Sequence, residues 1–104
     1  SLLVQQPQLW LLDEPTNHLD LHHQVGLLHQ LCAQVREQQQ LLIMSLHDLN
    51  LAARFCDYLM LMHKDGSIQA GPAAQLLTEA VLSRLYGHPI RQVIDRGQSI
   101  FIPL

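Results

Sequence analysis

The sequence predicts an α/β fold in which parallel strands are joined by crossover helices. Two short, continuous apolar runs, residues 9–12 and 41–45, have the length expected of strands buried on both faces. Between these runs, apolar residues recur at helical spacing from Val25 to Val35. Because strands joined by a helix of this length form a right-handed crossover unit, we expect the two strands to be parallel and to end at the same edge of the sheet.

Individual residues set the beginnings and ends of these elements. Pro15 stops the first strand, Asp20 can cap the first helix, and a second helix follows Asp48. The pattern then predicts, in order, a strand over 58–62, a turn over 64–67, a strand over 67–70, a chain break at Gly71-Pro72, helices over 73–77 and 79–86 ended by Gly87, and a hairpin of strands over 90–94 and 99–102. We interpret four residues within predicted strands as packing residues: Trp10, Met44, Met60 and Met62.

The composition indicates a globular chain that is one domain or part of one. Of the 104 residues, 48% are hydrophobic and 14% are charged, and no apolar stretch approaches the roughly 20 residues that a membrane helix requires. The net charge is -3 and the six basic residues are scattered, so nucleic acid is not an expected partner. Cys32 and Cys56 lie among apolar helical positions, which suits free thiols in a reducing compartment.

Polar side chains that can do chemistry follow both predicted strands. Asp13 and Glu14 end the first strand, and His47 and Asp48 follow the second. In a parallel sheet these positions meet at the ligand-binding edge, where one carboxylate can face a hydrated metal and the next an attacking water, as nucleotide hydrolysis requires. An Asp-Glu pair alone also fits a helix start or a solvated loop, but the His-Asp pair at the next strand favours a catalytic site.

Residues 9–20 resemble the Walker B motif and D-loop of ABC-type ATPases, and residues 45–48 resemble their H-loop. The resemblance implies that Asp13 holds Mg²⁺ through water, that Glu14 polarises the hydrolytic water and that His47 contacts the γ-phosphate of ATP. These roles suit phosphoryl transfer, which depends on positioning and charge neutralisation more than on covalent chemistry.

The rest of the chain is similar to one type of ABC ATPase. Residues 45–50, 52–57, 66–71 and 81–87 resemble ATP-binding subunits of bacterial importers for iron-siderophore, haem or cobalamin. The resemblance implies an ATPase that powers import, with transmembrane permease subunits and a second ATPase subunit as partners. It also implies that Asp20 lies at the interface between the two ATPase subunits. Such a protein is cytoplasmic and peripheral on the inner face of the bacterial cell membrane.

Two motifs of this family do not occur in the sequence. There is no Gly-x-x-x-x-Gly-Lys-Ser/Thr phosphate loop and no Gly-rich signature, so the resemblance is to the C-terminal part of a P-loop NTPase (ABC ATPase) domain without its phosphate-loop strand. Residues 1–88 would belong to the ATPase core and residues 89–104 would form a C-terminal β-hairpin tail. We expect the chain alone to be inactive and its exposed strand edge to allow self-association.

Other functions are compatible with parts of the sequence. Residues 13–20 are also similar to translation-associated ABC proteins that act on ribosomes, but the acidic charge balance, Asn50 and residues 52–57 follow the importer pattern. A non-catalytic interaction module, which contacts a transporter or its partner without hydrolysing ATP, is a second alternative. A structural domain with an accidental motif is a third.

Four histidines lie close together in the sequence. Imidazoles one helical turn apart can bind zinc, but Gly26 stands four positions after His22, and no cysteine or acidic residue completes a ligand set. We therefore interpret the cluster as solvated helix surface. Its members are His18, His22, His23 and His29.

Overall fold

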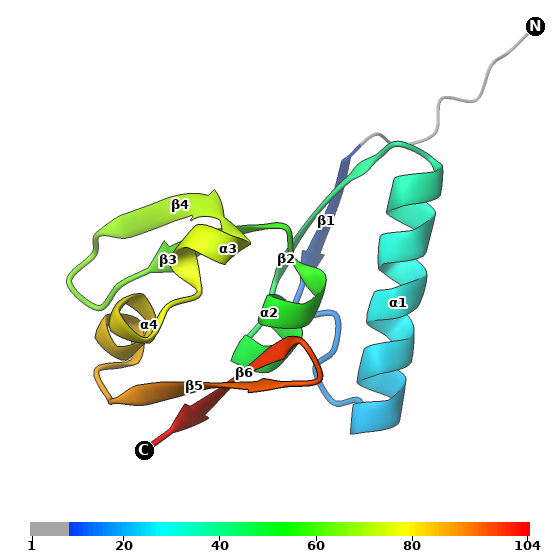
Figure 1. Ribbon diagram of the computed structural model, residues 1–104. Helices are drawn as coiled ribbons and strands as arrows, with labels where there is room; N and C mark the ends of the chain where they lie inside the picture. The colour runs from blue at the N-terminus through cyan, green and yellow to red at the C-terminus, as the bar shows by residue number, and fades with distance from the viewer. Residues whose placement is uncertain (1–8) are drawn as a thin grey trace, which may run out of the picture. The chain divides into compact units, whose positions relative to one another are not determined.

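Residues 9–104, which are the residues described by the computed structural model, form six strands and four helices (Figure 1). In chain order they are β1 (Leu9–Asp13), α1 (Leu21–Glu37), β2 (Leu41–Ser45), α2 (Leu49–Phe55), β3 (Tyr58–Met62), β4 (Ile68–Pro72), α3 (Ala73–Leu76), α4 (Glu79–Tyr86), β5 (Ile90–Asp95) and β6 (Gln98–Pro103). The chain divides into two units, the first ending at His47 and the second running from Asp48 to Leu104. The first unit holds β1, α1 and β2, and the second holds the remaining elements.

The first unit is the crossover that the sequence predicts. β1 and β2 are parallel, and their register places Asp13 opposite Ser45 at the carboxyl ends of the strands. α1 connects the strands and begins after Asp20, whose side chain accepts a hydrogen bond from the backbone N–H of His23 (2.9 Å). This bond satisfies one of the backbone donors that the start of a helix leaves unpaired. The two strands, their parallel pairing and the helix cap are therefore confirmed.

One face of the β1–β2 sheet is exposed, although the sequence predicts strands buried on both faces. Burial alternates along both strands, and Leu11 on the outer face is 70% exposed. The unit contains a single helix, α1, which can cover only one face, so the prediction of two buried faces is wrong for the described residues. The outer face carries Leu9, Leu11, Leu41 and Ile43 and ends at Asp13 and Ser45.

The core of the second unit lies where α4 meets the β5–β6 hairpin. Its centre consists of Leu82 on α4, which is fully buried, with Ile90 and Phe101. α2 packs on β6, because the Asn50 side chain donates to the Phe101 carbonyl (3.2 Å) and accepts from the Phe101 N–H (2.8 Å). α4 ends at Gly87 in the left-handed conformation (φ 62°), as predicted.

The β3–β4 hairpin is antiparallel, as predicted, but its second strand is longer than predicted. Gly71 and Pro72 continue β4 instead of breaking the chain, and α3 starts directly after them. A proline is tolerated here because β4 is an edge strand and Pro72 is its last residue, where the missing N–H removes no inner hydrogen bond of the sheet.

Side-chain burial also differs from the prediction on β3. Met60 and Met62 are 68% and 73% exposed, so their interpretation as core residues is wrong. Both alternate with Leu61, which is buried on the opposite face of the hairpin. Trp10 of β1 is half-buried, and its indole N–H donates a hydrogen bond to the Gln40 side chain (2.8 Å).

The strands of residues 9–104 pair only within three two-stranded sheets, β1–β2, β3–β4 and β5–β6. The β5–β6 hairpin belongs to the same compact unit as α2 and α4. The predicted division between residues 88 and 89 concerns the organisation of the family and stays a prediction. In the part of the chain that the structure describes, the helices are too short or too polar to cross a membrane.

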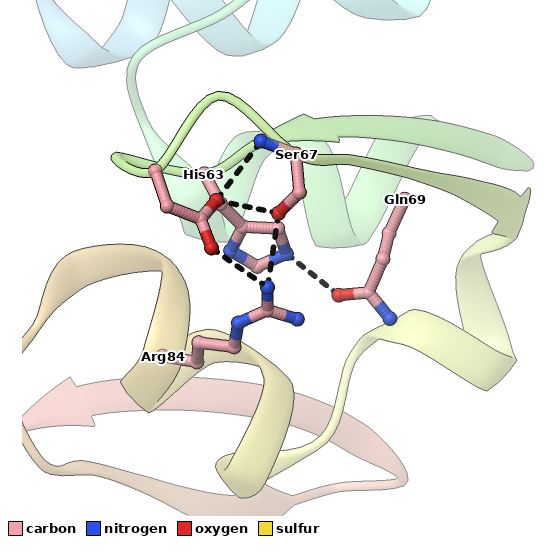
Figure 2. A network of polar contacts seen from close by, with 5 residues as sticks. His63, Ser67, Gln69 and Arg84 are labelled. Atoms are coloured by element: carbon pink, nitrogen blue, oxygen red, sulfur yellow. Dashed lines mark hydrogen bonds and ion pairs between the residues drawn. The ribbon is translucent and has the colours of Figure 1, made fainter.

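A polar network fastens the turn between β3 and β4 to α4 (Figure 2). Arg84 of α4 donates to Ser67 Oγ (2.9 Å) and to Asp65 Oδ2 (3.3 Å). Asp65 also accepts hydrogen bonds from the Ser67 hydroxyl (2.6 Å) and backbone N–H (2.9 Å). Beside the turn, buried His63 pairs through Nε2 with the Gln69 side chain (2.6 Å). The bonds from Ser67, and then those from Arg84, lower the pKa of Asp65 to about 2.

The low pKa of Asp65 predicts a loss of stability in acid. Because the folded pKa of about 2 lies below the usual value of 3.8, the ionised carboxylate stabilises the folded chain fully above pH 3.8, and this contribution disappears as the pH falls toward 2. We therefore expect Asp65→Asn to be less stable than the wild type near neutral pH and to approach it in acid, as measured by urea unfolding. Asp95→Asn, a change at an exposed residue at the end of β5, is the matched control. A stability difference for Asp65→Asn that does not vary with pH would contradict the prediction.

Candidate functional site

The carboxyl ends of β1 and β2 bring Asp13 and Ser45 together. The two residues are register partners in the parallel sheet, and both lie on its outer face. The Ser45 hydroxyl donates a hydrogen bond to Asp13 Oδ1 (2.6 Å), a short distance that is typical of bonds to a charged acceptor. The neighbouring strand therefore orients the Asp13 carboxylate.

Glu14 leaves β1 in a backbone conformation that non-glycine residues rarely adopt. Its φ is 45°, in the left-handed region, which costs a residue with a side chain about 1–3 kcal/mol. The Glu14 N–H is held by two acceptors of one residue, Ser45 Oγ (2.9 Å) and the Ser45 carbonyl (3.1 Å). The Glu14 carbonyl accepts from the Asn17 N–H (3.0 Å), which closes the following turn. These bonds fix the direction in which the Glu14 side chain leaves the strand.

Glu14 and His47 lie side by side, as the sequence predicts. His47 follows β2 by two residues, and its Nε2 contacts Glu14 Oε1. The Glu14 side chain is 31% exposed and the His47 side chain is 87% exposed, so a ligand can reach both. The pair combines a carboxylate that can act as a base with an imidazole that can donate a hydrogen bond to an anion.

Asp20 occupies a different part of the unit, at the N-terminus of α1. Its Oδ1 accepts a hydrogen bond from the His23 N–H (2.9 Å) and contacts His23 Nδ1 (2.7 Å). These interactions, first that of the His23 backbone and then that of its side chain, lower the pKa of Asp20. The structure therefore assigns Asp20 a capping role, and its place at a subunit interface stays a prediction.

The loop between Glu14 and Asp20 is fastened to α1 by Gln24. The Gln24 side-chain amide donates to the carbonyls of Leu19 (3.0 Å) and Thr16 (3.4 Å), and Thr16 is only 8% exposed. This contact satisfies backbone oxygens that a turn otherwise leaves to solvent. The path of the loop is thus set by the helix that follows it.

No individual role is predicted for Ser45 or Gln24 from the sequence. The role of Ser45 could have been inferred from strand register. Ser45 is the last residue of β2, and in the parallel register it stands opposite Asp13, the last residue of β1. For Gln24 the signal is weaker, since a glutamine in the first turn of a helix is equally common on a solvated surface.

Asp13 fits the predicted role of a magnesium ligand. Mg²⁺ prefers oxygen ligands and is usually bound through one or two carboxylates, with water and phosphate oxygens completing its shell. Within residues 9–104, Asp13 Oδ1 is bonded to Ser45 while Oδ2 has no hydrogen-bond partner, which leaves one carboxylate oxygen for a hydrated ion. The same residues contain no group of three or more His, Cys, Asp or Glu side chains that could hold a metal ion by itself.

The chain is similar to ATP-binding proteins of transport systems, although no family model matches it. The achromobactin transport ATP-binding protein CbrD of Dickeya dadantii is 39% identical over 93 residues. The hemin import ATP-binding protein HmuV of Escherichia coli O157:H7 is 43% identical over 100 residues. These alignments cover 89% and 90% of this chain but 35% and 39% of the two relatives. The chain thus spans less than two fifths of the length of the curated relatives it matches.

A solved structure described as an inward-facing metal-chelate type ABC transporter matches as well. The match has a TM-score of 0.82 and 28% sequence identity, and it covers 93% of this chain and 40% of the other. Because the match includes nearly all of the chain, the α/β fold of this chain is shared with a part of that structure.

Proposed function

This chain belongs to the ATP-binding proteins of ABC transporters, and we propose that it forms part of an ATP-hydrolysing subunit that powers import of a metal chelate. The relatives are named for achromobactin transport and hemin import, and the matching structure is of the metal-chelate type. These names support an iron-siderophore or haem as the substrate class, whereas cobalamin stays a prediction from the sequence. They favour an importer over the ribosome-associated ABC proteins that residues 13–20 also resemble.

The observation that carries this proposal is the contact between Glu14 and His47 next to Asp13. Glu14 has a fixed backbone, so its carboxylate can accept a hydrogen bond from a water and hold that water in line with a phosphate group. His47 can donate to a phosphate oxygen when that oxygen replaces Glu14 as the acceptor. Asp13 would hold Mg²⁺ through water, and bound Mg²⁺ neutralises charge on a transferring phosphoryl group.

The remaining roles concern partners of the complete protein. We infer that Asp20, which is exposed at the N-terminus of α1, contacts a second ATPase subunit in the assembled transporter. Its hydrogen bonds to His23 use Oδ1, and an exposed carboxylate with a lowered pKa remains charged and available to a partner at neutral pH. Transmembrane permease subunits would be further partners, which puts the complete protein in the cytoplasm at the inner face of the bacterial membrane.

Phosphate release from ATP tests the proposal. We expect the full-length ATP-binding protein that contains this segment to hydrolyse ATP in the presence of Mg²⁺. Hydrolysis should stop when EDTA removes the ion. The 104-residue chain should release no phosphate, because its sequence has no Gly-x-x-x-x-Gly-Lys-Ser/Thr loop to hold the phosphate groups. A full-length protein that binds its transporter but never hydrolyses ATP would support the non-catalytic interaction module instead.

A further inference from the structure

We propose that Ser45 is a positioning residue of this site, whose single hydroxyl sets both the Asp13 carboxylate and the Glu14 backbone. The inference rests on the proposed function, since it assigns to Ser45 the alignment of the two carboxylates that would serve ATP hydrolysis. It arises from two hydrogen bonds that meet at one atom, Ser45 Oγ.

The two hydrogen bonds use the hydroxyl in complementary ways. Ser45 Oγ donates its proton to Asp13 Oδ1 (2.6 Å) and accepts the proton of the Glu14 N–H (2.9 Å). A serine hydroxyl has one proton to donate, so the bond to Asp13 fixes the rotation of the hydroxyl and leaves its lone pairs toward the amide. The carboxylate and the amide are therefore oriented together rather than independently.

The bond to Asp13 has a direct consequence for a metal ligand. The terminal torsion of an aspartate is broad, so the carboxylate of a free Asp13 would sample many orientations. Holding Oδ1 on Ser45 selects one of them and leaves Oδ2 for a hydrated ion on the same outer face of the sheet. Loss of a hydrogen-bond partner of a metal-binding side chain typically lowers metal affinity or activity about 10–100-fold.

The bond to Glu14 has a different consequence. The left-handed backbone of Glu14 (φ 45°) aims the residue away from the strand direction, toward His47. Its N–H keeps a second acceptor, the Ser45 carbonyl (3.1 Å), which does not depend on the serine side chain. Removal of the hydroxyl should therefore loosen Glu14 while leaving the pairing of β1 and β2 intact, so a Ser45→Ala chain is expected to fold.

Amide hydrogen exchange in the 104-residue chain gives a readout that needs no nucleotide or metal. We expect Ser45→Ala to speed hydrogen exchange of the Glu14 amide roughly 2–10-fold, because the amide loses one of its two acceptors. Ser45→Thr keeps a hydroxyl at this strand position and should restore slow exchange. Ser67→Ala is the matched control, because the Ser67 hydroxyl bonds Asp65 over the same 2.6 Å in the other unit.

Kinetics of the full-length protein test the role in the reaction. We expect Ser45→Ala to raise the Mg²⁺ concentration for half-maximal hydrolysis about 10–100-fold, with a smaller effect on the KM for ATP. Ser45→Thr should return the Mg²⁺ requirement toward the wild-type value, and Ser67→Ala should leave it unchanged. A general loss of structure would not produce this selectivity for Mg²⁺ or this rescue.

Several outcomes overturn the inference. It fails if Ser45→Ala leaves both the Glu14 amide exchange and the Mg²⁺ requirement unchanged, or if Ser45→Thr behaves like Ser45→Ala. Absence of ATP hydrolysis by the wild-type full-length protein would refute the proposed function. In that case the exchange measurement still decides whether Ser45 positions Glu14, and an unchanged amide refutes that as well.

Discussion

Replacement of Glu14 by glutamine is expected to lower the kcat for ATP hydrolysis by the full-length protein about 10²–10⁴-fold, with little change in the Kd for ATP. Glutamine keeps the size of the side chain and can still accept a hydrogen bond from His47, so the local structure should survive. The change removes the negative charge and the basic oxygen that would polarise a water. Single-turnover phosphate release measures the rate, and binding of a fluorescent ATP analogue measures the affinity.

A matched control for this variant is available on the same unit. Glu37→Gln makes the same chemical change at an exposed residue at the end of α1. It should leave both the kcat and the Kd at their wild-type values. If Glu14→Gln retained most of the wild-type rate, Glu14 would be only a structural partner of His47, and the assignment of the general base would have to move to another residue.

The strands and their pairing could be predicted from sequence because local signals agree with the final fold. The apolar run before Asp13 and the run before His47 are short and bounded by turn residues, and a helix of suitable length separates them. The crossover rule then fixes the strands as parallel. The same rule brings Glu14 to His47, which the structure confirms.

The exposure of the sheets could not be predicted in the same way. Apolar residues on both faces of β1 predict burial on both faces, but burial also requires a second layer, and residues 9–47 contain one helix. Leu11 therefore remains 70% exposed although its side chain is apolar. The apolar neighbours of Met60 in the sequence likewise predict a core residue, but Met60 lies on the exposed face of the β3–β4 hairpin.

The role proposed for Ser45 could not be predicted from the sequence, for a different reason. Its function depends on which residue stands opposite it across the sheet, and this is a matter of strand register rather than of spacing along the chain. A shift of one residue would place the hydroxyl on the other face, away from Asp13. Sequence motifs that name only the carboxylates and the histidine therefore omit Ser45, which hydrogen-bonds both the Asp13 carboxylate and the Glu14 backbone.

Replacement of Leu82 by alanine is expected to destabilise the second unit by about 2–5 kcal/mol. Leu82 is fully buried between Ile90 and Phe101, so truncation removes apolar contacts and leaves a cavity that the hairpin can fill only in part. A unit of roughly 60 residues has a total free energy of unfolding of roughly 3–9 kcal/mol. The substitution would therefore remove a large share of that stability.

Urea unfolding followed by NMR of amides in β5 and β6 should report this loss, because those strands border the cavity. Leu104→Ala is the matched control, since it makes the same chemical change at a side chain that is 62% exposed, and it should cost only about 0.5 kcal/mol or less. Signals from the first unit, including the fluorescence of Trp10, are expected to keep their wild-type midpoint if the two units unfold independently. A Leu82→Ala chain as stable as Leu104→Ala would contradict the assignment of Leu82 to the centre of this core.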